Sequence, residues 1–96
     1  MTSLYLIKAG KNYKIGWTRN IQKRVVLFQT GNASRIKIIG DYPTNMPIQA
    51  LEAWFHEAFR DKRVRGEWFK LNDSDLIKFG ELLVSPKPKG FYARAL

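Results

Sequence analysis

The sequence predicts a small α+β domain in which a mainly antiparallel, three-stranded sheet is flanked by helices. Residues 4–8 and 13–17 are rich in aromatic and branched side chains and are separated by a short glycine-containing turn, which is typical of a β-hairpin. A third strand-like run covers residues 36–42. It lies between two stretches whose apolar residues recur every three or four positions, as on one face of a helix. The order β-β-α-β-α-(β)-α, in which the bracketed strand is the short apolar piece at residues 67–71, favours a mainly antiparallel sheet with helices packed on it.

Helix boundaries follow from capping residues and from proline. Asn20 can cap a first helix that runs over residues 20–29, and Gly31 follows it as a stop signal. Pro47 suits the first turn of a second helix, which we expect to cover residues 47–61. Each of these helices carries an apolar stripe that would face the sheet.

The last third of the chain is divided by turn and capping residues. The segment 62–71 begins as a basic turn and continues as a short apolar piece. Asn72 or Asp73 can then cap a last helix. We therefore expect one domain over residues 1–84, followed by a stiff basic tail, rich in proline and lysine, at 85–96.

The composition excludes several classes of site. The chain has no cysteine, which excludes disulfides, thiolate catalysis and iron–sulfur clusters. Its single histidine, His56, excludes a metal cage built from several histidines. No apolar run approaches the roughly 20 residues that a membrane span needs, and the first residues do not resemble a signal peptide. We therefore expect a soluble, cytoplasmic protein with no membrane partner.

The charge distribution indicates a polyanionic partner. The formal net charge is +9, and residues 1–40 contain eight lysines and arginines without any acid. A small domain with one strongly basic part is typical of proteins that bind nucleic acid, although a solvated surface would have the same composition. The residues expected to contact phosphates are Lys8, Lys11, Arg19, Lys23, Arg35, Arg63 and Arg65.

Two charged residues occupy unusual positions on the predicted helices. Arg24 lies on the shoulder of the apolar stripe, between Phe28 and Leu27, where an arginine either extends its head to solvent or is held for a purpose. Glu52 borders the stripe of the second helix, and His56 follows one turn later. A carboxylate in this position can bind a hard cation, or it can simply pair with His56.

Together these residues resemble the motifs of GIY-YIG nucleases. Ser-Leu-Tyr at 3–5 stands where that family has Gly-Ile-Tyr, and Lys-Ile-Gly at 14–16 stands where it has Tyr-Ile-Gly. Arg24 matches the arginine on the first helix of the family, and Glu52 matches its metal-binding glutamate. Gly-Glu-Trp-Phe at 66–69 also resembles a phage and bacterial branch that is often described as a DNA-binding domain.

The resemblance implies a metal-dependent endonuclease that hydrolyses phosphodiester bonds, with duplex DNA as the expected substrate. Arg24 would bind the scissile phosphate through its two-donor fork. Glu52 would hold one Mg²⁺ or Mn²⁺, because a single carboxylate leaves the remaining ligands to water and phosphate. Tyr5, or less favourably His56, would orient or deprotonate the attacking water.

Two residues of these motifs, Lys14 and Glu67, can each have more than one role. Lys14 occupies the position of the second family tyrosine, while Tyr13 lies one residue earlier and points to the opposite face of the strand. Lys14 therefore either takes over a proton-transfer role or binds phosphate. Glu67 is the second candidate metal ligand, but at the start of a short strand we expect it to pair with Arg63 or Arg65 and organise the turn.

Two other functions agree with parts of the sequence. A non-catalytic DNA-binding module of a phage or mobile-element protein would use the basic residues and would have no need of Glu52. An RNA-binding protein would use the aromatic residues of the strands as stacking platforms. The sequence contains no RNP-like or Gly-x-x-Gly signature that would favour the RNA-binding class.

Overall fold

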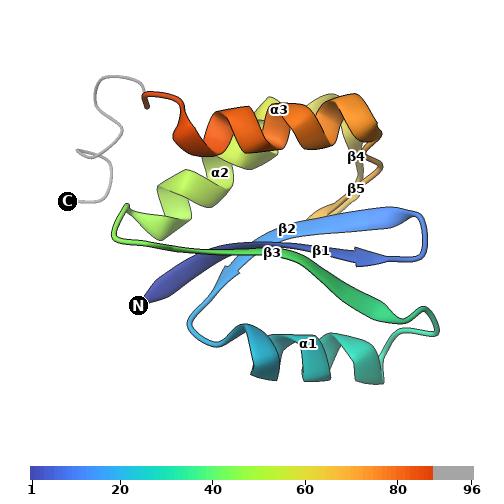
Figure 1. The fold of residues 1–96 in the computed structure, drawn as a ribbon. Helices are drawn as coiled ribbons and strands as arrows, with labels where there is room; N and C mark the ends of the chain where they lie inside the picture. Colours follow the sequence, from blue (N-terminus) through green and yellow to red (C-terminus); the bar gives the residue numbers. More distant parts are fainter. Residues whose placement is uncertain (88–96) are drawn as a thin grey trace.

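Within residues 1–87, which the computed structural model describes, five strands form one antiparallel sheet (Figure 1). The strands are β1 (Thr2–Ala9), β2 (Asn12–Thr18), β3 (Ile36–Thr44), β4 (Arg63–Arg65) and β5 (Trp68–Phe69). Their order in the sheet is β3-β1-β2-β5-β4. The helices of this part of the chain are α1 (Ile21–Thr30), α2 (Ile48–Ala58) and α3 (Asp73–Val84). The α+β class is confirmed.

The sheet has two more strands than the sequence predicted. The expected basic turn and the apolar piece that follows it pair with one another as β4 and β5, joined through Gly66, whose φ of 53° suits glycine. β5 then adds to β2 at Tyr13 and Lys14. The prediction of three strands was wrong because strands of three and two residues are too short to show a period of two.

Helices cover both faces of the sheet, with α2 and α3 on one side and α1 on the other (Figure 1). On the α2 side, Leu6 and Ile15 pack in a core with Phe55. On the α1 side, Tyr5 and Ile7 pack against an apolar stripe that consists of Ile21, Val25 and Phe28. The alternation along β1 thus directs neighbouring residues into two different cores.

Local capping signals place the helix starts as predicted. The side chain of Asn20 accepts a hydrogen bond from the backbone N–H of Lys23, and Asn72 forms a capping box with Asp75. The second helix is shorter than expected, because it ends at Ala58 and a 3₁₀ turn covers Arg60–Lys62.

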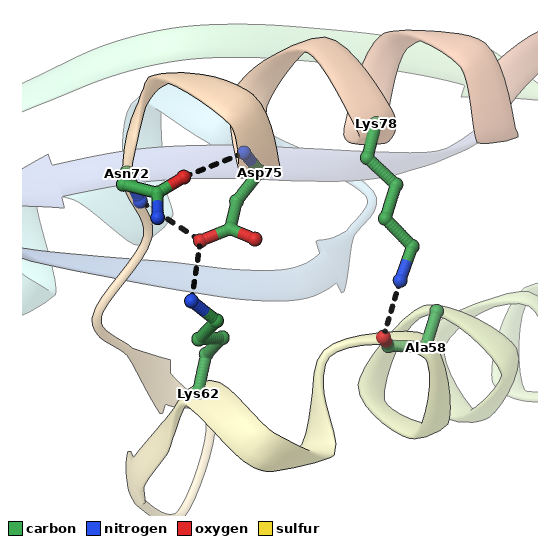
Figure 2. A network of polar contacts seen from close by, with 5 residues as sticks. All are labelled: Ala58, Lys62, Asn72, Asp75 and Lys78. Atoms are coloured by element: carbon green, nitrogen blue, oxygen red, sulfur yellow. Dashed lines mark hydrogen bonds and ion pairs between the residues drawn. The ribbon is translucent and has the colours of Figure 1, made fainter.

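Polar contacts fasten the start of α3 to the segment that leads into β4 (Figure 2). Lys62 Nζ lies 3.4 Å from Asp75 Oδ2, the same oxygen that accepts the backbone N–H of Asn72. Lys78 Nζ donates to the carbonyl oxygen of Ala58 at 3.0 Å. These contacts fix where the chain leaves α2 and enters the β4–β5 hairpin, which carries part of the candidate site.

The predicted basic tail falls mainly outside the described residues, which end at Lys87. The Lys87 ammonium lies 4.4 Å from the centre of the Trp54 ring and donates to the carbonyl oxygen of Leu82. In the part of the chain that the structure describes, no helix is long and apolar enough to cross a membrane.

Candidate active site

The candidate site forms where β5 leaves the edge of β2 uncovered. The backbone N–H of Ile15 still donates to the carbonyl oxygen of Glu67, at 3.1 Å. Beyond this point side chains of α2 take the place of a neighbouring strand: His56 Nε2 contacts the carbonyl oxygen of Ile15 at 2.7 Å, and Glu52 lies close enough to the Trp17 backbone for it to lower the Glu52 pKa. Groups from the α2 side therefore reach around the sheet edge to the α1 side.

Tyr5 forms the floor of this site. It lies directly opposite Gly16 in the β1–β2 register, and its side chain is 2% exposed. A Cβ atom at residue 16 would overlap the Tyr5 hydroxyl and ring, so this position requires glycine. The hydroxyl makes no hydrogen bond to another residue within 1–87, yet no buried side-chain oxygen there lacks a partner. The hydroxyl oxygen therefore reaches solvent.

Burial and the nearby carboxyl groups keep the Tyr5 hydroxyl protonated. Burial raises its pKa well above the ordinary value, and the nearby charge of Glu67 acts in the same direction. Glu52 also raises this pKa, whereas Arg24 lowers it. A protonated hydroxyl can orient a water molecule by hydrogen bonding, but it does not supply a phenolate base at neutral pH.

Two carboxyl groups meet beside Tyr5. Burial raises the pKa of Glu52 to about 7, and the charge of Glu67 and a hydrogen bond between the two carboxyl groups act in the same direction. Lys14 and the backbone N–H of Trp17 lower it. Ligand oxygens of the two carboxyl groups lie within 4.8 Å of each other, so a cation between them would relieve the repulsion that arises when both are ionised.

Glu67 has a different partner from the one predicted. Its Oε2 atom lies 3.3 Å from Lys14 Nζ, whereas the sequence had favoured Arg63 or Arg65. That prediction was wrong because β5 pairs with β2 at Lys14 and Trp68, which brings the residue before Trp68 beside the Lys14 side chain. This pairing joins segments more than fifty residues apart, so no local pattern indicates it.

Lys14 is held in place by aromatic rings as well as by Glu67. Its ammonium lies 4.1 Å from the centre of the Phe28 ring and 5.4 Å from that of the Trp68 ring. The side chain is only 13% exposed. The expected arrangement on β2 is confirmed, because Lys14 and Gly16 share the α1 side while Tyr13 and Ile15 pack in the core on the other face.

Both ring nitrogens of His56 are engaged. A carbonyl oxygen can only accept, so Nε2 donates its hydrogen to Ile15. A guanidinium can only donate, so Nδ1 accepts from Arg63 Nη2, at 3.2 Å. These contacts select the neutral Nε2–H tautomer and replace the pairing with Glu52 that the sequence allowed. They favour a role for His56 in positioning β2 and Arg63 over direct contact with metal or water.

Arg24 projects from α1 toward the same site. It is half-buried, its guanidinium lies 5.9 Å from the centre of the Phe28 ring, and it is close enough to affect the pKa of Tyr5. No acid lies within 4.0 Å of its nitrogens among residues 1–87. Its donors are therefore available to an anion placed above Tyr5.

A basic groove of about 580 Å³ leads away from the site. It runs between the end of α1, the β1–β2 turn and the β4–β5 hairpin, and its lining includes Lys11, Lys14 and Arg65. Phe28 and Trp68 supply the aromatic part of its wall. The groove shares Lys14 with the carboxylate pair, so a chain of phosphates in it would pass directly beside Glu67.

The other residues expected to bind nucleic acid are spread over the surface. Lys23 is exposed on α1, and the Arg19 guanidinium lies 5.7 Å from the centre of the Trp17 ring. Lys8 and Arg35 line an adjoining hollow of about 340 Å³, which shares Gly10 and Ser34 with the groove. The groove itself is lined by only part of the predicted set, and Lys8 and Arg35 lie next to it.

Glu52 is expected to destabilise the folded chain as pH rises. In the unfolded chain its carboxyl ionises around pH 4.5, but its folded pKa is about 7, so ionisation opposes folding increasingly between these values and fully above pH 7. In EDTA, the melting temperature of Glu52→Gln minus that of the wild type should be larger at pH 8 than at pH 5. Thermal unfolding followed by circular dichroism measures this difference.

Glu57→Gln is the matched control for this measurement. Glu57 lies on the same helix, its side chain is 71% exposed, and within residues 1–87 it pairs only with Arg60. The corresponding difference for this variant should be small and independent of pH. An equal pH response in the two variants would contradict the assignment of a raised pKa to Glu52.

Comparison with known proteins identifies a family. The chain matches the T5orf172 domain over residues 2–84. This span begins with the first residue of β1 and ends with the last residue of α3, so it includes every element of the candidate site. No curated protein and no solved structure matches the chain. The protein belongs to the T5orf172 domain family.

Proposed function

We propose that this T5orf172 domain is a metal-dependent DNA endonuclease of the GIY-YIG type. The family is one of phage-type, DNA-associated domains, which supports DNA as the partner. The observation that carries the proposal is that Arg24 of α1 and Glu52 of α2 are both close enough to Tyr5 of β1 to act on the pKa of its hydroxyl. Residues that match three separated motifs of a nuclease family are therefore neighbours in the fold.

The donor set fits a hard divalent cation. Glu52 and Glu67 offer carboxylate oxygens, and burial, followed by the charge of Glu67, raises the pKa of Glu52. Mg²⁺ and Mn²⁺ prefer oxygen ligands, whereas Zn²⁺ prefers nitrogen and sulfur, and the chain has no cysteine and one fully engaged histidine. When bound, such a cation stabilises negative charge on the phosphate and on the leaving oxygen.

Each residue of the site has a role that its geometry supports. Arg24 would donate two hydrogen bonds from its guanidinium to two non-bridging oxygens of the scissile phosphate. Such charge-assisted hydrogen bonds are stronger in a partly buried position than in water. Tyr5 would orient the attacking water through its protonated hydroxyl. His56 would hold the β2 edge and Arg63 in place. Lys11 and Arg65 would bind neighbouring phosphates along the groove.

A non-catalytic DNA-binding module is the second candidate. Lys14 stands in the place of a family tyrosine and is already neutralised by Glu67, which favours a site that binds without cutting. The basic groove would serve either function.

One experiment separates the two candidates. Supercoiled plasmid is incubated with the protein in Mg²⁺, in Mn²⁺ and in EDTA, and duplex binding is titrated at several salt concentrations in EDTA. We expect nicking only with the metals. Contact with about five phosphates should give a slope of log K against log[salt] of about −4 to −5. Steep binding without cleavage would favour the DNA-binding module, and a slope near zero would contradict both.

A further inference from the structure

Glu67 lies between the other two charged groups of the site. Its Oε2 atom contacts Lys14 Nζ at 3.3 Å, and its carboxyl group also has a ligand oxygen within 4.8 Å of one from Glu52. Its side chain is 39% exposed, so it can change partners without repacking the core. Its backbone, in contrast, is held by the hydrogen bond from Ile15 and by the adjacent pairing of β5 with β2. The backbone of Glu67 is therefore fixed, while its side-chain carboxylate can move.

The distances suit simultaneous binding of one ion by both glutamates. The donor atoms of Glu52, Glu67 and His56 all lie within 4.8 Å of one another. In octahedral Mg²⁺ coordination with bonds of about 2.1 Å, neighbouring ligand atoms are about 3 Å apart and opposite ones about 4.2 Å apart. A small side-chain rotation thus brings the two carboxylates onto one ion. His56 does not join them, because both of its nitrogens are already bonded.

Tyr5 gives independent support for a ligand at this point. It is a polar side chain that is 2% exposed, and its hydroxyl has no partner within residues 1–87. The charges of both glutamates act on this hydroxyl. The hydroxyl reaches solvent, so an ion held by the carboxylates, with its bound water, would give it an ordered hydrogen-bond partner in place of bulk water.

We propose that Glu67 is a second metal ligand beside Glu52, and that the cation displaces Lys14 from Glu67 and so releases the Lys14 ammonium to a DNA phosphate in the groove. This inference rests on the proposed function. Lys14 already lines the groove, so its head needs only to turn from Glu67 toward the groove interior. In the metal-free protein Glu67 neutralises Lys14, and in the metal-bound protein the same lysine adds a positive charge where DNA passes.

Binding of Mn²⁺ to the full chain without DNA, followed by electron paramagnetic resonance, tests this inference without any cleavage assay. Glu52→Gln and Glu67→Gln should each weaken Mn²⁺ binding at least tenfold. Lys14→Met keeps an apolar stem against Phe28 and Trp68 but no longer competes for Glu67, so it should tighten Mn²⁺ binding severalfold. Glu57→Gln, on an exposed part of α2, should leave it unchanged.

Two results would overturn the inference. Wild-type Mn²⁺ affinity in Glu67→Gln would show that this residue only pairs with Lys14. Weaker Mn²⁺ binding in Lys14→Met, with an unchanged circular dichroism spectrum, would contradict the exchange of partners. Plasmid nicking tests the proposed function separately from this inference. If the variants show the expected Mn²⁺ affinities but the wild type does not nick plasmid, the two-carboxylate site is supported and the nuclease function is contradicted.

Discussion

Arg24→Lys is expected to lose at least about 100-fold in the rate of plasmid nicking, while its affinity for uncut duplex DNA falls less than about threefold. The guanidinium is partly buried against Phe28 and has no acidic partner among the described residues, so its two-donor fork is available to the phosphate. A lysine retains the charge but not the planar fork, and the loss of one such contact to developing charge costs about 100-fold or more.

The measurement is a nicking time course at saturating protein beside a binding titration in EDTA. Lys23→Gln provides the control, because Lys23 is the exposed neighbour on the same helix. This variant should weaken binding slightly and leave the rate at saturation unchanged. Wild-type nicking by Arg24→Lys would mean that Arg24 only packs its stem against Phe28 and extends its head to solvent.

Glu52→Gln is expected to abolish metal-dependent nicking, with a loss of about 1000-fold or more, while DNA binding in EDTA is kept or becomes tighter. The glutamine amide is nearly the same size as the carboxylate but has no negative charge with which to bind a divalent cation. The substitution also removes a negative charge that would repel the DNA phosphate. Glu67→Gln should reduce nicking only partly, and higher Mn²⁺ should recover some of it, because Glu52 remains.

The two variants are compared in one nicking assay with Mn²⁺ varied over several orders of magnitude. Full activity in Glu52→Gln together with none in Glu67→Gln would reverse the assignment of the main ligand. Full activity in both would contradict any mechanism in which a carboxylate-bound metal takes part.

Much of the fold could be predicted because its signals are local. Asn20 and Asn72 cap helices through hydrogen bonds to residues only three positions away, and those residues are visible in any short window. The alternation of β2 correctly separates Lys14 and Gly16 from Tyr13 and Ile15. The β4–β5 hairpin was missed, because strands of three and two residues show no alternation and β5 joins the sheet only by pairing with β2.

The sequence predicted which residues belong to the candidate site better than it predicted the contacts that those residues make. Arg24 and Glu52 stand out because each places a charge beside an apolar helical stripe, a conflict that is visible in the sequence. The partners of His56 and Glu67 do not stand out. His56 bonds to a backbone carbonyl on β2, and Glu67 pairs with Lys14. Both contacts join segments that are forty or more residues apart.

Local pattern and composition were therefore sufficient to indicate the α+β class, the helix starts, the basic character and the residues that carry unusual charges. Tertiary structure alone decided that the pairing of β5 with β2 ends at Lys14, so that no strand within residues 1–87 covers the Ile15 carbonyl and the Trp17 backbone on that side. A buried carbonyl oxygen needs a donor, and His56 of α2 supplies it for Ile15. Glu52, one turn earlier on the same helix, thereby comes close enough to Tyr5 to act on its pKa, and this arrangement depends on strand pairing that no short stretch of sequence encodes.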